Sequence, residues 1–171
     1  MKDGTARTIS REDLAKLPIR RWAGRVCVAA TPQDLDEARS AAKPSSGGAY
    51  SVLIVEDEPA LAATMRKFLE LERFVPRVAA NRDEVAAELR KPPLPDLILL
   101  DVMLAGASGF DILERLRGHP VLKPIPIIMV TAMSAREDVM RALAGDANGY
   151  ITKPFKLDVL MKSIKAVLGI G

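Results

Sequence analysis

A run of aliphatic residues that ends in a carboxylate constrains the fold of this chain more than any other feature. Leu97 to Leu100 are all aliphatic, Asp101 follows them, and three prolines lie just upstream at positions 92, 93 and 95. Such a short apolar run predicts a strand buried on both faces, as in a parallel sheet covered by helices. Asp101 would then lie at the edge of the sheet where open α/β folds bind ligands. For Asp101 alone, a helix-capping role is the simpler interpretation.

Strand and helix signals alternate five times from Tyr50 onward, which indicates βαβ units. The predicted strands cover residues 51–55, 75–79, 97–100, 125–130 and 149–152, and a helix is predicted after each. The last helix has the clearest pattern, an apolar stripe from Leu157 to Leu168. We therefore predict an α/β fold, a doubly wound (βα)5 flavodoxin-like three-layer sandwich with a parallel sheet of strand order 2-1-3-4-5.

The first 49 residues differ from the rest in composition. We predict an N-terminal extension over residues 1–42, partly helical and of unknown role, with helix starts at Ser10 and Thr31 and an extended stretch at 26–30. Residues 43–49 have the composition of a flexible linker, and residues 50–171 form the predicted domain. The net charge of +3 lies entirely in residues 1–49. The neutral remainder gives no support for a nucleic-acid partner.

The sequence shows no feature of a secreted or membrane protein. It contains no apolar run of about 18 residues and no hydrophobic stretch after its basic N-terminus, so we expect neither a membrane span nor a secretory signal. Its lone cysteine, Cys27, excludes an internal disulfide. These observations favour a cytoplasmic protein.

Polar side chains follow the ends of the predicted strands. In the predicted strand order the first and third strands are neighbours, which places Glu56 and Asp57 beside Asp101. Three carboxylates repel one another, so such a cluster requires a cation, and Mg²⁺ suits oxygen ligands. Thr131 and Lys153 follow the fourth and fifth strands and bring a hydroxyl and an ammonium to the same edge. This combination predicts a site for a phosphoryl group.

The same residues resemble a known family. Glu56-Asp57, Asp101, Thr131, Tyr150 and Lys153-Pro154-Phe155, in this order, resemble the receiver domains of bacterial two-component response regulators. The intervals match that family: 44 residues from Asp57 to Asp101, 30 to Thr131, 19 to Tyr150 and 3 to Lys153. The resemblance covers about residues 50–169, and the joint pattern is much more specific than any single motif.

The resemblance implies a phosphoacceptor function. Asp101 would take a phosphoryl group from the phosphohistidine of a histidine kinase or a histidine phosphotransfer protein. The metal ligands for Mg²⁺ would be Glu56, Asp57, Asp101 and the backbone carbonyl of Met103. Thr131 and Lys153 would contact the phosphoryl oxygens, and Tyr150 would turn inward as Thr131 moves. The fourth helix, fifth strand and fifth helix would form the surface that controls a downstream protein, which the sequence does not identify.

The loop after Asp101 and the entrance of the site carry residues that can be compared with the usual pattern of this family. Ala105 stands where the family usually has proline, which predicts a more mobile loop after Asp101. Met103 and Met133 occupy positions at the site entrance that tune dephosphorylation in the family. Our hypothesis is that these two apolar side chains hinder a hydrolytic water and so lengthen the phosphorylated lifetime.

Two alternatives use the same fold or the same chemistry. One is a scaffold that acts without phosphorylation. The other is a Mg²⁺-dependent phosphatase with an Asp nucleophile, resembling the haloacid-dehalogenase group, but that group expects an acid where Met103 stands. A nucleotide site is excluded because the turn from Glu56 to Pro59 lacks glycine. We expect a stand-alone response regulator without an effector domain, or a fragment of a longer protein. It would not be an enzyme, although it would assist its own phosphorylation and dephosphorylation.

Overall fold

The described residues form a mixed sheet of seven strands in the order β1-β2-β9-β8-β5-β3-β4. The computed structural model describes residues 19–22, 25–28, 48–133 and 136–170. Five of the strands are parallel: β3 (Ser51–Val55), β4 (Val75–Ala79), β5 (Leu97–Leu100), β8 (Ile127–Thr131) and β9 (Gly149–Thr152). Their order, β4-β3-β5-β8-β9, is the flavodoxin-like order 2-1-3-4-5, which confirms the predicted fold class.

Burial along the strands follows from their place in the sheet. Every residue of β3, β5, β8 and β9 is buried, as expected of parallel strands covered on both faces. The edge strand β4 is more exposed, and it contains Pro76, which has no N–H to donate to a neighbouring strand. This distribution places the continuous apolar runs of the sequence at the centre of the sheet.

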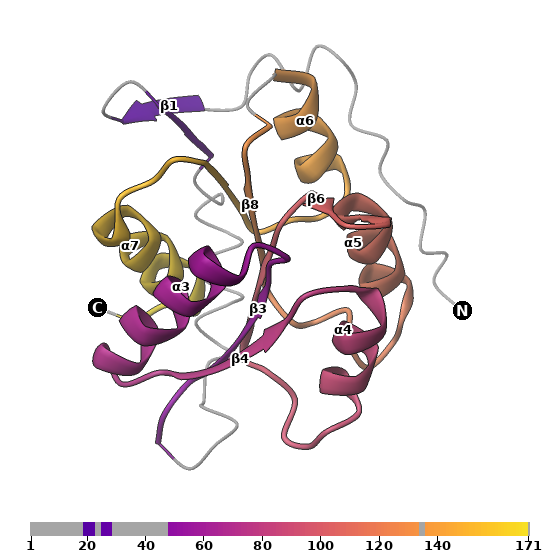
Figure 1. Cartoon of the computed structure of the whole chain (residues 1–171). Coiled ribbons are helices and arrows are strands. Elements are labelled where there is room, and N and C mark those ends of the chain that lie inside the picture. Colours follow the sequence, from indigo (N-terminus) through magenta and orange to yellow (C-terminus); the bar gives the residue numbers. More distant parts are fainter. Residues whose placement is uncertain (1–18, 23–24, 29–47, 134–135, 171) are drawn as a thin grey trace.

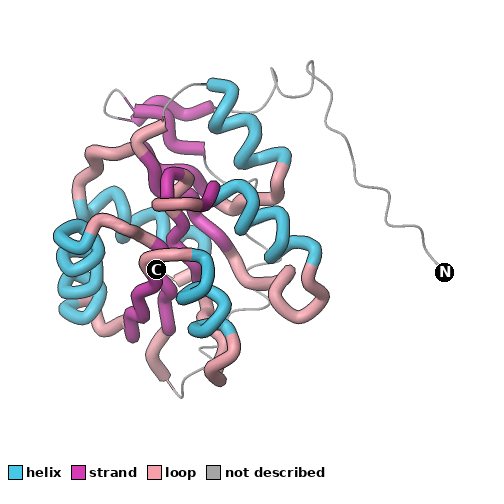
Figure 2. Tube along the Cα trace, turned by 45° about the vertical axis from the view of Figure 1, so that its right-hand side comes forward, coloured by secondary structure: helices cyan, strands magenta, loops and turns pink. Residues whose placement is uncertain are grey.

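Helices cover both faces of the sheet (Figures 1 and 2). On one face lie α3 (Pro59–Leu71) and α7 (Leu157–Leu168), and on the other lie α4 (Arg82–Leu89), α5 (Gly109–Gly118) and α6 (Arg136–Ala144). The side chains of β3 alternate between the two layers: Val52 and Ile54 pack toward α3 and α7, whereas Leu53 and Val55 pack toward the other helices. The result is the predicted three-layer sandwich.

Side-chain caps begin two of the helices. Asn81 accepts a hydrogen bond from the backbone N–H of Glu84 at the start of α4, and Asn is a preferred N-cap residue. Ser108 accepts one from Phe110 at the start of α5. The sequence Ser134-Ala135-Arg136-Glu137 also predicts a capping box at the start of α6, and Ser134 lies outside the described residues.

The strand count predicted for residues 50–171 is incomplete. The loop after β5 contains a small hairpin of β6 (Met103–Leu104) and β7 (Ala107–Ser108), with Gly106 at φ +74° in its turn. The prediction missed it because strands of two residues carry no readable alternation. The fourth parallel strand begins at Ile127 rather than at residue 125, and it includes Thr131.

Part of the N-terminal extension belongs to the main sheet. The strands β1 (Ile19–Trp22) and β2 (Arg25–Val28) form an antiparallel hairpin, and β2 pairs antiparallel with β9, with Val28 opposite Tyr150. The extended stretch predicted from residue 26 is confirmed as far as Val28, whereas β1 was not predicted. The helices predicted from Ser10 and Thr31, and the linker up to residue 47, lie outside the described residues.

Within the described part of the chain, no helix combines the length and the apolar character needed to cross a membrane.

Candidate functional site

Three carboxylates meet at the carboxyl ends of two neighbouring strands. Glu56 and Asp57 follow β3, Asp101 follows β5, and these strands pair directly. Glu56 and Asp101 are almost completely buried, and Asp57 is partly exposed. One carboxylate oxygen from each residue lies within 4.8 Å of the others. The predicted convergence of the three acids is confirmed.

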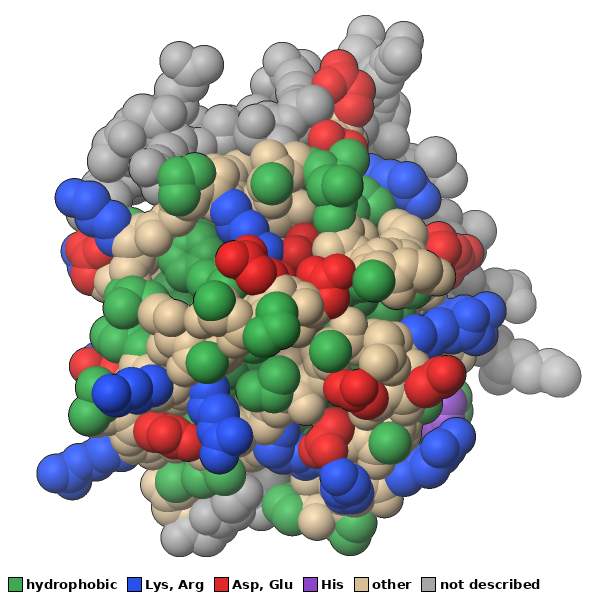
Figure 3. Space-filling model, viewed as in Figure 1, with side chains coloured by type: hydrophobic (Ala, Val, Ile, Leu, Met, Phe, Trp, Pro, Cys, Tyr) green, Lys and Arg blue, Asp and Glu red, His purple; other side chains and the backbone are tan. Residues whose placement is uncertain are grey.

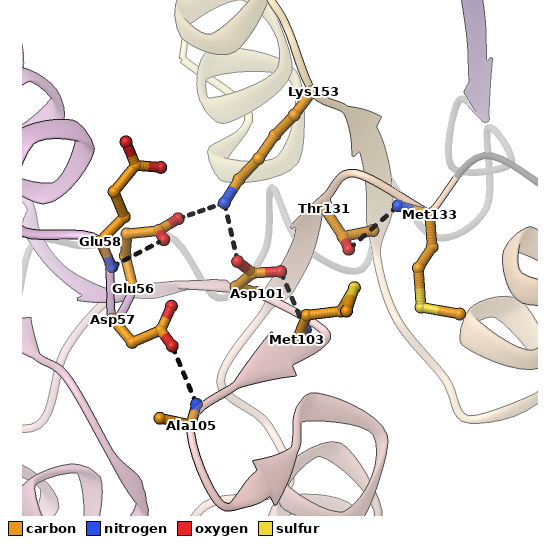
Figure 4. Close-up of polar contacts among 9 residues, drawn as sticks. All are labelled: Glu56, Asp57, Glu58, Asp101, Met103, Ala105, Thr131, Met133 and Lys153. Atoms are coloured by element: carbon orange, nitrogen blue, oxygen red, sulfur yellow. Dashed lines mark hydrogen bonds and ion pairs between the residues drawn. The ribbon is translucent and has the colours of Figure 1, made fainter.

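Lys153 lies between two of these acids (Figure 4). Its ammonium donates to Oε2 of Glu56 at 2.6 Å and to Oδ2 of Asp101 at 2.7 Å. The residue directly follows β9, and its backbone N–H donates to the carbonyl of Thr131 at 2.8 Å. The sheet therefore aims the lysine side chain into the carboxylate cluster.

Burial and charge pairing act in opposite directions at this site. Burial raises the pKa of the Glu56 carboxyl, and the hydrogen bonds from Lys153 and from the Glu58 N–H offset only part of that effect. Burial alone would lower the pKa of Lys153, but its hydrogen bonds to Asp101 and Glu56 together outweigh burial, so that pKa is raised. Lys153 therefore stays charged.

The donor set suits a metal ion. Lys153 contributes one positive charge opposite three carboxyl groups, so with all three ionised the cluster carries excess negative charge. All three side chains offer oxygen ligands, which hard divalent cations prefer. Acidic side chains gather near the middle of the face seen in Figure 3, with basic side chains beside them. The acidic cluster can therefore hold a metal cation.

The loop after Asp101 is hydrogen-bonded to two of the acids. The backbone N–H of Met103 donates to Oδ1 of Asp101 at 3.0 Å, and that of Ala105 donates to Oδ2 of Asp57 at 2.8 Å. The proline that the family usually has at position 105 lacks this N–H. The departure from the family pattern therefore adds a hydrogen bond to Asp57 that sequence reasoning missed. The predicted mobility of this loop stays a prediction.

Gly109 packs directly against the backbone of the Asp101 loop. A Cβ atom at this position would lie 2.0 Å from the carbonyl oxygen of Asp101. The N–H of Gly109 also donates to the carbonyl of Val102 at 2.8 Å. The first turn of α5 can approach Asp101 this closely only because residue 109 has no side chain.

Three residues on the far side of Asp101 form a connected set. Thr131 is completely buried at the end of β8, and its Oγ1 accepts a hydrogen bond from the Met133 N–H at 3.3 Å. The buried Tyr150 hydroxyl donates to the Met133 carbonyl at 2.6 Å. Burial raises the pKa of Tyr150, which keeps the hydroxyl protonated as a donor. Thr131 and Tyr150 are thus linked through the backbone of one residue.

The two methionines expected at the site entrance differ in exposure. Met103 is 61% exposed, and Met133 is partly buried against the core. In Figure 4 their side chains lie on the same side of Asp101 as Thr131. Met103, Met133 and Thr131 therefore lie together on one side of Asp101, and their predicted roles in the site stay predictions.

Comparison with known proteins identifies the family. A family model described as the response regulator receiver domain matches residues 52–165. The chain belongs to the response regulator receiver family. A solved receiver-type protein, described as a putative response regulator from Chloroflexus aurantiacus, superposes with a TM-score of 0.66 at 31% identity, over 71% of this chain and 98% of that one.

Other relatives extend the same result. A CheY-like receiver domain protein from Methanospirillum hungatei superposes with a TM-score of 0.65 at 29% identity, over 71% of this chain and 95% of that one. The phosphate regulon transcriptional regulatory protein PhoB of Rhizobium meliloti is 41% identical over 117 residues, 68% of this chain and 51% of that protein. The chain thus spans about half the length of the curated relatives it matches. Receiver domains are signalling modules of two-component systems.

Proposed function

We propose that Asp101 accepts a phosphoryl group from the phosphohistidine of a histidine kinase or of a histidine phosphotransfer protein. The observation that carries this proposal is the placement of a buried Asp101 against Lys153 and within 4.8 Å of two further acids. A carboxylate oxygen of Asp101 would attack phosphorus, and the P–N bond would break. The imidazole nitrogen would keep the electron pair and take up a proton, which leaves an acyl phosphate on Asp101.

Each surrounding residue has a role that follows from its position. Glu56, Asp57, Asp101 and the Met103 backbone carbonyl would hold Mg²⁺, which when bound neutralises charge on the phosphoryl oxygens. The Lys153 ammonium, already hydrogen-bonded to Asp101, would contact a phosphoryl oxygen.

The switch would begin at Thr131. A phosphoryl group brings about −1.5 to −2 charges and strong acceptor oxygens into the site. The Thr131 hydroxyl would turn to donate to one of these oxygens, which would draw in the loop that contains Met133. Because Tyr150 donates to the Met133 carbonyl, the change would reach β9. We propose that the surface formed by α6, β9 and α7 thereby controls a downstream protein in the cytoplasm.

Transcriptional regulation is a second candidate output. The observation in its favour is that the matched relatives include proteins named as transcriptional regulators, of which this chain spans about half. On that reading these residues would be the receiver part of a longer protein. Affinity capture with the phosphorylated chain, with and without residues 1–49, tests the protein-contact output directly.

Intact-mass measurement with acetyl phosphate and Mg²⁺ tests the phosphoacceptor role. We expect a gain of about 80 Da, the mass of one phosphoryl group, on the unaltered chain. Asp101→Asn should abolish the gain, and Asp111→Asn, at an exposed acid in the first turn of α5, should leave it unchanged. Sustained release of phosphate with turnover would support the phosphatase alternative, and the absence of any adduct would support the scaffold.

A further inference from the structure

The outer edge of β9 is occupied by a segment of the same chain. Without β2, β9 would be the last strand of the parallel sheet, and its outward N–H and C=O groups would be open to any other strand. In the structure β2 pairs with this edge, and β1 pairs with β2 in turn (Figure 1, the indigo hairpin). Residues 19–22 and 25–28 thus form a hairpin, the edge hairpin, that covers β9.

The opposite edge of the sheet shows the contrast. On β4, Val75 is 44% exposed and the three residues after it are only partly buried. All four residues of β9 are buried. Edge strands are commonly protected by covering elements because an open edge is a template for pairing with another chain. Among the described residues, a strand pairs with the outer edge of β9, and none pairs with the outer edge of β4.

We propose that the edge hairpin is a built-in occupant of the β9 edge that phosphorylation of Asp101 releases, so that the edge is closed in the resting protein and opened in the phosphorylated one. This inference rests on the proposed function. It adds to that function the means by which the β9 surface is kept from a protein that would pair with it.

A short series of contacts joins the site to the hairpin. Thr131 Oγ1 accepts from the Met133 N–H, the Met133 carbonyl accepts from the Tyr150 hydroxyl, and the backbone of Tyr150 is paired with Val28 of β2. Thr131 and Tyr150 are both buried, so neither can change its contacts without moving packed neighbours. A phosphoryl oxygen that accepts a hydrogen bond from the Thr131 hydroxyl would therefore disturb β9, the strand with which β2 pairs.

The pairing between β2 and β9 is short enough to be reversible. The strand β2 has four residues, and it joins β9 as part of the same chain, so it competes at high effective concentration with any external strand. A short strand pairing contributes little stability compared with the core. A modest change in β9 is therefore sufficient to shift the balance between the covered and the open edge.

The lone cysteine provides a direct test of the covered edge. Continuing the antiparallel register of Val28 and Tyr150 by one residue sets Cys27 opposite Ile151. Opposed residues on antiparallel strands have Cα separations of about 4.5–5.5 Å, within the range for a disulfide. In the Ile151→Cys variant, mild oxidation should therefore form an intramolecular disulfide. Val75→Cys on β4, at the other edge, is the matched control and should form none.

Release of the edge hairpin is measured by the rate at which this disulfide forms. After treatment with acetyl phosphate and Mg²⁺, we expect the Ile151→Cys variant to form it at least fivefold more slowly. In the Ile151→Cys/Asp101→Asn double variant, the same treatment should leave the rate unchanged. The phosphoryl adduct is followed by intact mass in the same samples.

Hydrogen exchange gives a second readout that needs no change in the core. In the unaltered chain, phosphorylation should speed exchange of the amides in β9. Proline in place of Val26 has no N–H to donate to a neighbouring strand, so Val26→Pro should disrupt the edge hairpin and speed exchange of the same amides without phosphorylation. Exchange in β4 should change in neither case.

Four outcomes would overturn the inference. No intramolecular disulfide, together with β9 exchange unaffected by Val26→Pro, would show that the hairpin does not cover the edge. A disulfide between two chains in its place would show that a second copy is the occupant. If the phosphoryl adduct forms but the rate of disulfide formation and the exchange in β9 do not change, the hairpin covers the edge but phosphorylation does not release it. Absence of the adduct would overturn both release and the proposed function.

Discussion

Lys153 offsets part of the negative charge of the site in the structure. It donates to two buried acids, Glu56 and Asp101, at 2.6 and 2.7 Å. Two carboxylates buried together are costly when ionised, because each has lost water and each repels the other. The lysine supplies both the opposite charge and the hydrogen bonds that offset this cost.

Removal of the Lys153 ammonium should destabilise the metal-free protein. We expect Lys153→Ala to lower the free energy of unfolding by about 1–3 kcal/mol, because two buried acids lose a charged hydrogen-bond donor. Added Mg²⁺ should recover part of the loss by supplying positive charge to the folded state. Urea unfolding with and without Mg²⁺ measures both effects. The control is Lys156→Ala, at an exposed lysine before α7, and an equal loss in that variant would contradict the assignment.

The Ala105 N–H should hold Asp57 ready to bind a metal. Ala105→Pro removes the donor to Asp57, and we expect Mg²⁺ affinity to fall by about threefold to tenfold, the worth of one such hydrogen bond. Ala105→Ser keeps the N–H and should bind Mg²⁺ like the unaltered chain. Titration calorimetry gives both constants. Equal or tighter binding by Ala105→Pro would show that this hydrogen bond does not help Asp57 to bind the metal.

The entrance methionines should slow hydrolysis of the acyl phosphate. Replacing Met103 and Met133 together with Asn should raise the decay rate by roughly threefold to tenfold, a barrier change of about 1 kcal/mol, because polar side chains admit water. Val121→Asn is a matched control, since Val121 is also 61% exposed but lies in the loop after α5. Loss of the adduct followed by intact mass gives the rates. An unchanged rate in the double variant would refute the hypothesis.

Residue type and spacing were sufficient to predict that the acids and the lysine meet. Glu56, Asp101 and Lys153 each directly follow a strand, and the strand order of the fold brings those positions together. The Ala105 contact could not be predicted in this way, because its donor is a backbone group that every residue except proline possesses. Sequence reasoning sees which side chains are present and misses what the backbone of a loop contributes.

At the scale of elements, contacts at both ends of α5 hold the segments around the site in place. Gly109 lets α5 begin against the Asp101 loop. At the other end of α5, the partly buried Arg117 guanidinium donates to the carbonyls of Lys123, Ile125 and Asp146 and to the Asn148 side chain. One helix therefore fixes both the loop of the phosphoacceptor and the segments that lead into β8 and β9.

A side chain at residue 109 should displace that helix. Gly109→Ala would bring a Cβ atom within 2.0 Å of the Asp101 backbone, and we expect a loss of about 3 kcal/mol in the free energy of unfolding. Gly118→Ala at the end of the same helix meets no atom within 4 Å and should change stability by less than about 1 kcal/mol. Thermal unfolding of the two variants makes the comparison. Similar stabilities would contradict the close approach.

Elements with a long periodic pattern were predicted well, and short ones were not. The apolar stripe of α7 and the continuous runs of β3 and β5 report burial directly, which is why their positions are confirmed. The hairpin of β6 and β7 depends on a turn at Gly106 rather than on a pattern. The pairing of β2 with β9 joins segments more than 120 residues apart, and no local signal encodes it.

At the scale of the whole molecule, the sheet places the acidic site and the edge hairpin at adjoining positions. The acids lie at the carboxyl ends of β3 and β5, and Thr131 and Lys153 follow the same edge through β8 and β9. The strand that leads to Lys153 is also the strand covered by the edge hairpin. A change of charge at Asp101 is therefore only a few contacts from the border of the sheet.

Chemical trapping of the phosphorylated residue tests the central claim most directly. Borohydride reduces an acyl phosphate to an alcohol but leaves free carboxylates intact, so the phosphorylated aspartate becomes homoserine. After treatment with acetyl phosphate, Mg²⁺ and borohydride, peptide mass mapping should find homoserine at position 101 and aspartate at position 57. Homoserine at Asp57, or at no position in a chain that carries the adduct, would contradict the account.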